Sequence, residues 1–260
     1  MSGGAKLDRR RLLQRGAAVA GAALLGGCEE LSRRPFVKRI LDSAEVLTRT
    51  AQRAVLPRKA LAREYSEADI SKEFKANGST NSNDPAYLAL AAGGFADWRL
   101  KVGGLVEQPL ELSLADLKEM PSRTQITRHD CVEGWSCIGK WTGVPLKHVL
   151  DRAQLKPPAR YIVFYCADDL GETGSEAGKY YESIGFEDAC HPQTILAYDM
   201  NGQPLPVPHG APLRLRVERQ LGYKMAKYVM RIEAVEEIRT IRGGRGGFWE
   251  DLGYEWYAGI

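Results

Sequence analysis

The pattern of apolar and polar positions changes near residue 98. Before that point, apolar residues recur at helical spacing from Leu47 to Val55, after Asp42 and Ser43, which are both good N-cap residues. Pro57 cannot continue such a helix. After residue 98, short apolar runs are separated by turn residues, as is typical of strands. The chain therefore predicts one helix near its start and a strand-rich region after it.

The strand-rich region has few helices. The predicted strands are Trp98–Val102, Thr124–Arg128, Tyr161–Cys166, Ile195–Tyr198, Leu213–Val217 and Val229–Val235. Tyr161–Cys166 is continuously aromatic and aliphatic, which indicates burial on both faces. Short helices are predicted at Leu114–Leu117, capped by Ser113, and at Pro145–Leu150. This order of elements predicts a mixed, β-rich α+β domain.

The N-terminus has the layout of a signal peptide. Asp8–Gln14 contains consecutive arginines, and the Ala/Gly-rich apolar stretch Gly16–Leu25 follows. That stretch is too short for a spanning helix, which needs about 20 apolar residues. A twin-arginine signal directs the export of folded proteins, so we expect residues 1–28 to be a signal peptide and the protein to be periplasmic. Leu25–Cys28 also resembles a lipoprotein box, and acylation of Cys28 and plain cleavage nearby both remain open.

We divide the rest into a stalk with one helix at residues 29–70 and one domain at residues 71–260. Hydrophobic and charged contents of 44% and 27% are ordinary for a globular protein. The formal charge of +3 is too small to indicate a nucleic-acid partner. Beyond Cys28 the cysteines are Cys131, Cys137, Cys166 and Cys190, and none forms a CxxC pair. Two disulfides are possible in an oxidising compartment, unless one of these thiols binds a metal.

The densest group of chemically capable residues is the run from Arg128 to Ser136. Cys131 directly follows a predicted strand and begins a polar loop that contains Gly134. Arg128 and His129 are close enough in sequence to favour its thiolate, the form that binds metal or attacks a substrate. The alternative is a buried structural cysteine.

The segment Arg128–Leu146 resembles the molybdenum-binding segment of the sulfite-oxidase superfamily. It is most similar to the branch that contains the catalytic subunit of periplasmic protein-methionine-sulfoxide reductase. That branch has Cys-Val-Glu-x-Trp-Ser followed by Trp-x-Gly-x-Pro-Leu, and both patterns stand here in order. The resemblance runs from about Phe74 to Ile260 and implies that Cys131 is the protein thiolate on molybdenum.

A second stretch, Pro208–Arg214 followed by Gly222–Lys227, matches the part of the family that holds the pterin and its phosphate. The resemblance assigns this role to a set of residues at the matching positions. These residues are Asn77, Cys166, His209, Arg214, Met225, Ala226 and Lys227. Arg and Lys are suited to phosphate. For Arg214 the alternative is a solvent-exposed charge on a strand edge, and for Asn77 it is an Asn-Gly turn.

Some features depart from the family. Cys166 stands where relatives often have threonine, and the Tyr-Glu pair that follows the family's Asn is missing after Asn77. The Cys-Ala-Gly-Asn-Arg pattern of sulfite oxidases is absent, and the chain ends at Ile260 without their immunoglobulin-like domain. We therefore expect a monomer and disfavour sulfite oxidation. The Gly-rich, aromatic tail 242–257 is expected to cover the site, to present a docking surface, or simply to pack on the domain.

The resemblance implies a molybdenum–molybdopterin oxidoreductase that reduces an S-oxide or N-oxide such as methionine sulfoxide. The sequence contains no CxxCH haem motif, so we expect electrons from a separate membrane haem protein. Two alternatives remain. One is an oxidative molybdoenzyme that passes electrons to a haem partner, and the other is a metal-free binding lipoprotein with the same fold.

Overall fold

The structure is a computed structural model, and it describes Phe36, residues 43–44, 47–48, 50–51, 60–171 and 177–260. Contacts divide the chain into two units, Met1–Ala54 and Val55–Ile260. In the first unit, the described residues of the predicted N-terminal helix are helical. The predicted signal peptide, Cys28 and Pro57 lie outside the described residues, so those expectations stay predictions.

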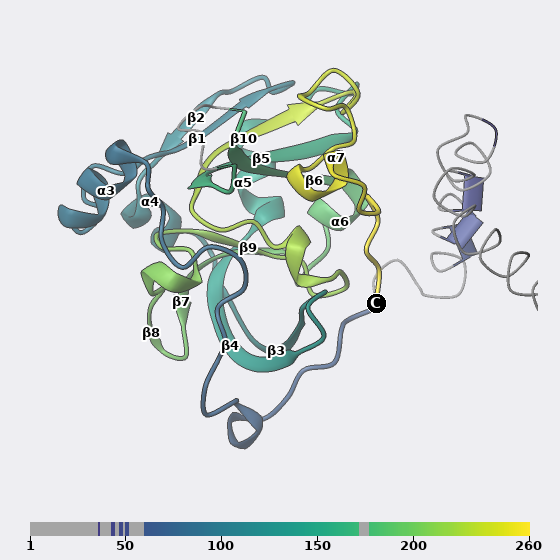
Figure 1. The fold of residues 1–260 in the computed structure, drawn as a ribbon. Helices are drawn as coiled ribbons and strands as arrows, with labels where there is room; N and C mark the ends of the chain where they lie inside the picture. Colours follow the sequence, from purple (N-terminus) through teal and green to yellow (C-terminus); the bar gives the residue numbers. More distant parts are fainter. Residues whose placement is uncertain (1–35, 37–42, 45–46, 49, 52–59, 172–176) are drawn as a thin grey trace, which may run out of the picture. The chain divides into compact units, whose positions relative to one another are not determined.

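Within the described residues of the second unit, ten strands form two sheets of five (Figure 1). The first sheet has the order β2-β1-β10-β5-β6. Its strands are β1 (Leu100–Gly104), β2 (Leu110–Leu112), β5 (Tyr161–Asp169), β6 (Lys179–Gly185) and β10 (Val229–Val235). All its pairings are antiparallel except β1 with β10, where Val102 pairs with Ile232. The long step along the chain from β1 to β10 makes this parallel pairing possible.

The second sheet has the order β3-β4-β7-β8, and β9 also pairs with β7. Its strands are β3 (Arg123–Asp130), β4 (Ser136–Pro145), β7 (Ile195–Met200), β8 (Gln203–Pro204) and β9 (Arg214–Arg216). The β3–β4 hairpin pairs Asp130 with Ser136, and its five-residue loop contains Cys131. The fold thus places the predicted metal ligand at the tip of a regular hairpin.

Short helices connect the strands. They are α3 (Pro85–Ala92), α4 (Leu114–Glu119), α5 (Leu146–Ala153), α6 (Phe186–Ala189) and α7 (Phe248–Asp251), with 3-10 turns η1 (Glu67–Asp69), η2 (Val207–His209) and η3 (Gly222–Lys224). Asp84 caps α3 by accepting from the amides of Ala86 and Tyr87, and Ser113 caps α4 through the Asp116 amide. The predicted cap at Ser113 is confirmed. No helix among the described residues is long and apolar enough to span a membrane.

The main hydrophobic core lies between the two sheets. Leu100, Ile162 and Phe164 from the first sheet pack in one cluster with Leu196 and Leu215 from the second. The prediction of a mixed, β-rich α+β domain is confirmed, and the structure also contains strands that the pattern did not indicate. The clearest of these is β4, whose glycines and polar residues hide its alternation.

One glycine of β4 is required by packing. A Cβ at Gly143 would overlap the carbonyl oxygen of Leu196 and lie 2.6 Å from the Cα of Ala197, where β4 and β7 shift register. Backbone atoms cannot rotate away as a side chain can, so a substitution must move a strand. The glycine of the Trp-x-Gly-x-Pro-Leu pattern therefore has a structural role in this chain.

We expect Gly143→Ala to lower the free energy of unfolding by about 2–3 kcal/mol, the upper part of the range for overpacking. Urea denaturation followed by circular dichroism measures this. Gly103→Ala is the matched control, because Gly103 also lies in a strand but its added Cβ would meet nothing within 4 Å. Equal stability of the two variants would contradict the close approach of β4 and β7.

Candidate active site

The loop that carries Cys131 is closed by its own backbone. The Cys131 amide donates to the Trp135 carbonyl at 2.9 Å, and the Gly134 amide donates to the Cys131 carbonyl at 3.0 Å. Gly134 has φ +85°, a conformation that favours glycine. The Trp135 indole donates to the Glu133 carboxylate at 2.9 Å, which fixes that side chain over the loop. The loop therefore holds the thiol in one place.

Cys131 is 9% exposed and lines a cavity. Its lining comes from both sheets, the segment 77–79 and the C-terminal segment. The lining residues are Asn77, Gly78, Ser79, Cys131, Val132, Glu133, Asp168, Leu170, Tyr180, Tyr223, Met225, Lys227, Trp249 and Tyr254. A cavity that combines apolar residues with a few polar groups is typical of a site for a cofactor or a small substrate.

The expectation about the charges near Cys131 was wrong. Burial raises the pKa of the Cys131 thiol, and the nearby cations that lower it are Lys75 and Arg214, not Arg128. Arg128 instead forms an ion pair with Asp130 at the protein surface. The Cys131 thiolate therefore needs a stronger partner than the chain itself provides, and a bound metal ion is such a partner.

His129 is buried and does not carry the charge that we expected. Burial lowers the pKa of His129 well below its usual value, and the Arg214 and Arg216 cations add to this. The imidazole is therefore neutral. Arg216 lies 3.1 Å from its Nδ1, which makes Nδ1 the acceptor and places the proton on Nε2. Gly222 packs on this ring so closely that a Cβ there would overlap it.

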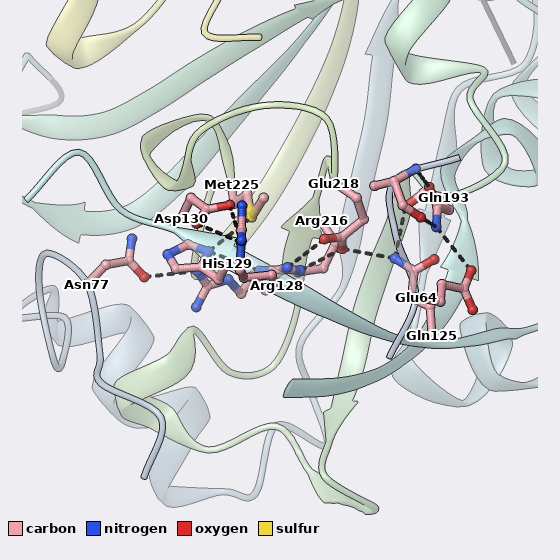
Figure 2. A network of polar contacts seen from close by, with 12 residues as sticks. Glu64, Asn77, Gln125, Arg128, His129, Asp130, Gln193, Arg216, Glu218 and Met225 are labelled. Atoms are coloured by element: carbon pink, nitrogen blue, oxygen red, sulfur yellow. Dashed lines mark hydrogen bonds and ion pairs between the residues drawn. The ribbon is translucent and has the colours of Figure 1, made fainter. Parts of the chain in front are cut away.

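A buried polar network extends from His129 through Arg216 and Glu218 toward Gln125 and Gln193 (Figure 2). Arg216 binds Glu218 through two hydrogen bonds of 2.9 and 2.7 Å, and both side chains are fully buried. Glu218 also accepts from Gln125 at 2.9 Å, and Gln125 donates to the Gln193 carbonyl at 3.0 Å. Since every charge in this part of the network is paired, Arg216 and Glu218 orient His129 and are not available to a ligand.

Arg214 is also fully buried, but it has no carboxylate partner of its own. Its Nη2 donates to the Asn77 side-chain oxygen at 2.9 Å and its Nη1 to the His209 carbonyl at 3.1 Å. Its Nε is buried without a hydrogen-bond partner. Burial and the nearby Arg216 lower the pKa of Arg214 to about 9. The alternative of a solvent-exposed strand-edge charge is therefore wrong for Arg214.

Lys227 is held by backbone oxygens only. Its Nζ donates to the carbonyls of Asn77 at 2.7 Å, Pro208 at 3.3 Å and Ser79. Burial and the Arg214 cation lower the pKa of Lys227 to about 7. Gly210, with φ +105°, packs against the Lys227 side chain so closely that no other residue fits there. This contact explains why a glycine follows His209.

Asp168 is a cavity residue that the sequence analysis missed. Its Oδ2 accepts from the Ser79 hydroxyl at 2.8 Å, whereas its Oδ1 is buried without a partner. Burial raises the pKa of Asp168 to about 6. The predicted strand Tyr161–Cys166 ends three residues before the observed end of β5 at Asp169, so Asp168 lay outside the predicted strand. Only the longer β5 brings this carboxylate to the cavity.

The predicted site residues do not all meet at the cavity. Asn77, Cys131, Met225 and Lys227 line it, and Arg214 contacts it through Asn77. His209 lies beside this group, with the pKa of its imidazole lowered to about 4 by burial. Cys166 and Ala226 are buried in the main hydrophobic core, outside the residues that line the cavity. The cofactor role of each of these residues stays a prediction.

The cysteines beyond Cys28 are all described, and none is in a disulfide. Cys137 on β4 is partly exposed, whereas Cys166 is buried. Cys190 at the end of α6 is also partly exposed. The two disulfides that the cysteine count allowed are therefore absent from the described residues.

Comparison with known proteins now adds to this geometry. A family model described as an oxidoreductase molybdopterin-binding domain matches residues 89–240. A protein of Azospira oryzae, provisionally named a protein-methionine-sulfoxide reductase subunit (YedZ1), is 35% identical over 96% of this chain and 87% of its own length. The chain belongs to the molybdopterin-binding oxidoreductase family. The predictions of an enzyme of the sulfite-oxidase type and of a molybdenum–molybdopterin cofactor are confirmed.

Two further matches have more specific names. The protein-methionine-sulfoxide reductase catalytic subunit MsrP of Xanthomonas axonopodis pv. citri is 36% identical over 94% of this chain and 73% of its own length. The crystal structure of the sulfane dehydrogenase SoxCD from Paracoccus pantotrophus has a TM-score of 0.48 and 27% identity, and covers 54% of this chain and 39% of that chain.

The residues around the cavity fit the molybdopterin cofactor. The Arg214 and Lys227 cations are both buried against Asn77 with lowered pKa values, and among the described residues neither forms an ion pair. An anionic phosphate would stabilise both cations and supply the partner that Arg214 Nε lacks. In this molybdopterin-binding oxidoreductase, Arg214 and Lys227 would hold the phosphate, Asn77 would orient Arg214, and Cys131 would bind the metal.

The pKa of Lys227 predicts how the cofactor-free protein responds to pH. Between pH 7 and 10.5 the unfolded chain binds more protons at Lys227 than the folded protein does, so stability rises with pH in this window and is lost as pH falls through 7. We expect the unfolding free energy of wild type relative to Lys227→Met to increase by a few kcal/mol from pH 7 to pH 10, because each pKa unit corresponds to about 1.36 kcal/mol.

Urea denaturation of cofactor-free protein at several pH values measures this difference. Lys101→Met is the control, because the Lys101 side chain is 64% exposed and distant from buried charge. A difference between wild type and Lys227→Met that stays constant with pH would show that Lys227 is not forced toward its neutral form.

Proposed function

We propose that this molybdenum-cofactor enzyme reduces sulfoxides, with methionine sulfoxide in exported proteins as the substrate. The observation that carries the proposal is the similarity over 94% of the chain to a protein named as the catalytic subunit of protein-methionine-sulfoxide reductase. The Cys131 thiol at the cavity fits this activity. The reaction converts a sulfoxide, two electrons and two protons into a thioether and water.

The cofactor supplies the two-electron chemistry at the metal, and the chain supplies binding and orientation. Cys131 would hold the metal at the tip of the β3–β4 hairpin. Arg214 and Lys227 would bind the phosphate, and the neutral His129 ring packs against Trp135 of the Cys131 loop.

The electron donor is proposed to be a membrane haem protein. The name "catalytic subunit" of the similar reductase indicates that a further subunit belongs to that enzyme. The sequence of this chain has no CxxCH motif for covalent haem attachment. A partner that feeds electrons from the membrane is compatible with a twin-arginine signal and with an acylated Cys28, which would keep the enzyme at the membrane surface.

We expect Cys131→Ala to lose molybdenum and to reduce methionine sulfoxide at a rate lower by roughly 100-fold or more, since even groups that only support metal ligands contribute up to that factor. Metal analysis and an assay with reduced viologen as donor measure both effects. Cys137→Ala is the matched control, because Cys137 lies six residues further on in β4 and outside the cavity lining.

Molybdenum bound as tightly in Cys131→Ala as in wild type would contradict the ligand assignment. A molybdenum-loaded wild type that oxidises sulfite and does not reduce sulfoxides would contradict the proposed direction of the reaction. The oxidative alternative would then replace it.

For the compartment, we expect Arg9→Lys combined with Arg10→Lys to leave the protein in the cytoplasm, because the export route recognises the arginine pair. Cell fractionation and immunoblotting of the periplasm measure this. Arg15→Lys, which changes an arginine outside the pair, is the control. In the wild-type background, Cys28→Ala should release the exported protein from the membrane fraction. Normal export of the double variant would contradict the twin-arginine route.

A further inference from the structure

The C-terminal segment builds one wall of the cavity. Trp249 and Tyr254 both line it, and their rings stack with centroids 5.4 Å apart and an angle of 28° between their planes. The Tyr223 ring meets Tyr254 edge-on at 5.3 Å. The Phe248 ring meets the Trp249 ring edge-on, with centroids 5.4 Å apart. These four rings form a continuous aromatic surface, of which Trp249, Tyr254 and Tyr223 face the cavity.

This aromatic wall is attached to Gly222–Lys227, the segment that the family resemblance assigns to the cofactor. Lys224 lies between the cavity residues Tyr223 and Met225 in the sequence. Its ammonium forms fully buried ion pairs of 2.5 Å with Glu182 and with Glu250 of α7. Figure 1 shows α7 beside β6, which carries Glu182. Removing one partner of a buried ion pair is strongly destabilising, so the anchor is rigid.

Further hydrogen bonds hold the last residues of the C-terminal segment. The Leu221 amide donates to the Ala258 carbonyl at 2.9 Å, and the Ile260 amide donates to the Arg219 carbonyl at 3.1 Å. The Tyr223 hydroxyl donates to the Glu255 carbonyl at 2.7 Å. The C-terminal segment is therefore attached at Glu250, between Trp249 and Tyr254, and again after Tyr254, and the wall is a built part of the site.

The cavity lining combines polar and apolar residues. Asn77, Asp168 and Lys227 are polar, whereas Val132, Leu170 and the aromatic rings are apolar. Since Asn77 and Lys227 are assigned to the cofactor, the apolar residues are the ones left to a substrate, and they match the two carbon arms of a sulfoxide. Sulfur groups and the carbon atoms next to them pack favourably against aromatic rings, with a stabilisation of about 0.3–1.5 kcal/mol for each contact.

We propose that the stacked pair Trp249–Tyr254 determines the specificity of the enzyme by binding the carbon arms of a dialkyl sulfoxide. This inference rests on the proposed sulfoxide reduction and adds a residue-level reason for it. An unbranched arm such as the side chain of methionine sulfoxide covers the aromatic pair. A compact oxide such as trimethylamine N-oxide leaves most of the pair uncovered, so the wall contributes little to its binding.

The test compares Trp249→Ala with wild type, using reduced viologen as donor. For N-acetylmethionine sulfoxide amide, kcat/KM should fall about 5- to 10-fold, mainly through KM, as expected for the loss of an aromatic contact of up to about 1.5 kcal/mol. For trimethylamine N-oxide, kcat/KM should stay within about two-fold. Trp249→Phe should recover most of the loss, because it restores an aromatic face.

Leu252→Ala is the matched control, because Leu252 directly follows α7 and is 67% exposed. A second readout is independent of turnover. Binding of N-acetylmethionine amide, which has the thioether of the product, is measured by calorimetry, and its affinity should weaken 5- to 10-fold in Trp249→Ala by about the same contact energy. Equal molybdenum content and melting temperature of all variants exclude misfolding as the cause.

The outcomes separate the two proposals. Failure of molybdenum-loaded wild type to reduce any sulfoxide overturns the proposed function, whatever the thioether binding shows. Sulfoxide reduction by wild type together with unchanged KM and thioether binding in Trp249→Ala overturns the role of the wall and leaves the function intact. A third outcome is a loss of kcat/KM in Trp249→Ala that is equal for both oxides and that appears with a physiological donor but not with viologen. This outcome would assign the Trp249–Tyr254 pair to electron-donor docking and would also overturn the inference.

Discussion

The burial of the Arg214 and Lys227 cations is the constraint on which the rest of the site depends. Among the described residues neither cation has an ion-pair partner, and both donate mainly to oxygens of the segments around Asn77 and His209. Such an arrangement costs free energy in the absence of an anion, as the lowered pKa values of both groups show. A phosphate at this position would offset that cost, because it would bring negative charge to both cations and an acceptor to Arg214 Nε.

The second sheet supports this group through a separate set of charges. Arg216 is two residues from Arg214 on the same strand, yet it is paired with Glu218 and serves the neutral His129. Trp141 lies against both guanidinium groups, at 5.3 Å from Arg214 and 4.3 Å from Arg216. The two arginines of this short strand therefore differ in their contacts: Arg216 forms an ion pair with a buried carboxylate, whereas Arg214 binds the neutral oxygens of Asn77 and His209.

The cavity joins parts of the chain that are distant in sequence. The β3–β4 hairpin supplies Cys131, β5 supplies Asp168, and the C-terminal segment supplies Trp249. The buried Lys224–Glu250 ion pair connects the last of these to the cofactor segment. A change in the C-terminal segment is therefore expected to be felt at the site, although Trp249 is more than 100 residues from Cys131 in the sequence.

The sequence by itself determined the fold class, the family and the position of Cys131. Local pattern was sufficient for strands such as β5 and β10, because alternation and β-branched runs are properties of a few neighbouring residues, but it did not indicate β4, whose glycines and polar residues hide its alternation. The tertiary structure alone decided which charges are buried, because Arg214 and Arg216 look alike in sequence and differ only in their partners. It also decided that Asp168 lines the cavity, that Cys166 does not, and that the tail forms a wall. These outcomes depend on contacts between distant segments, and no local pattern of residues encodes such contacts.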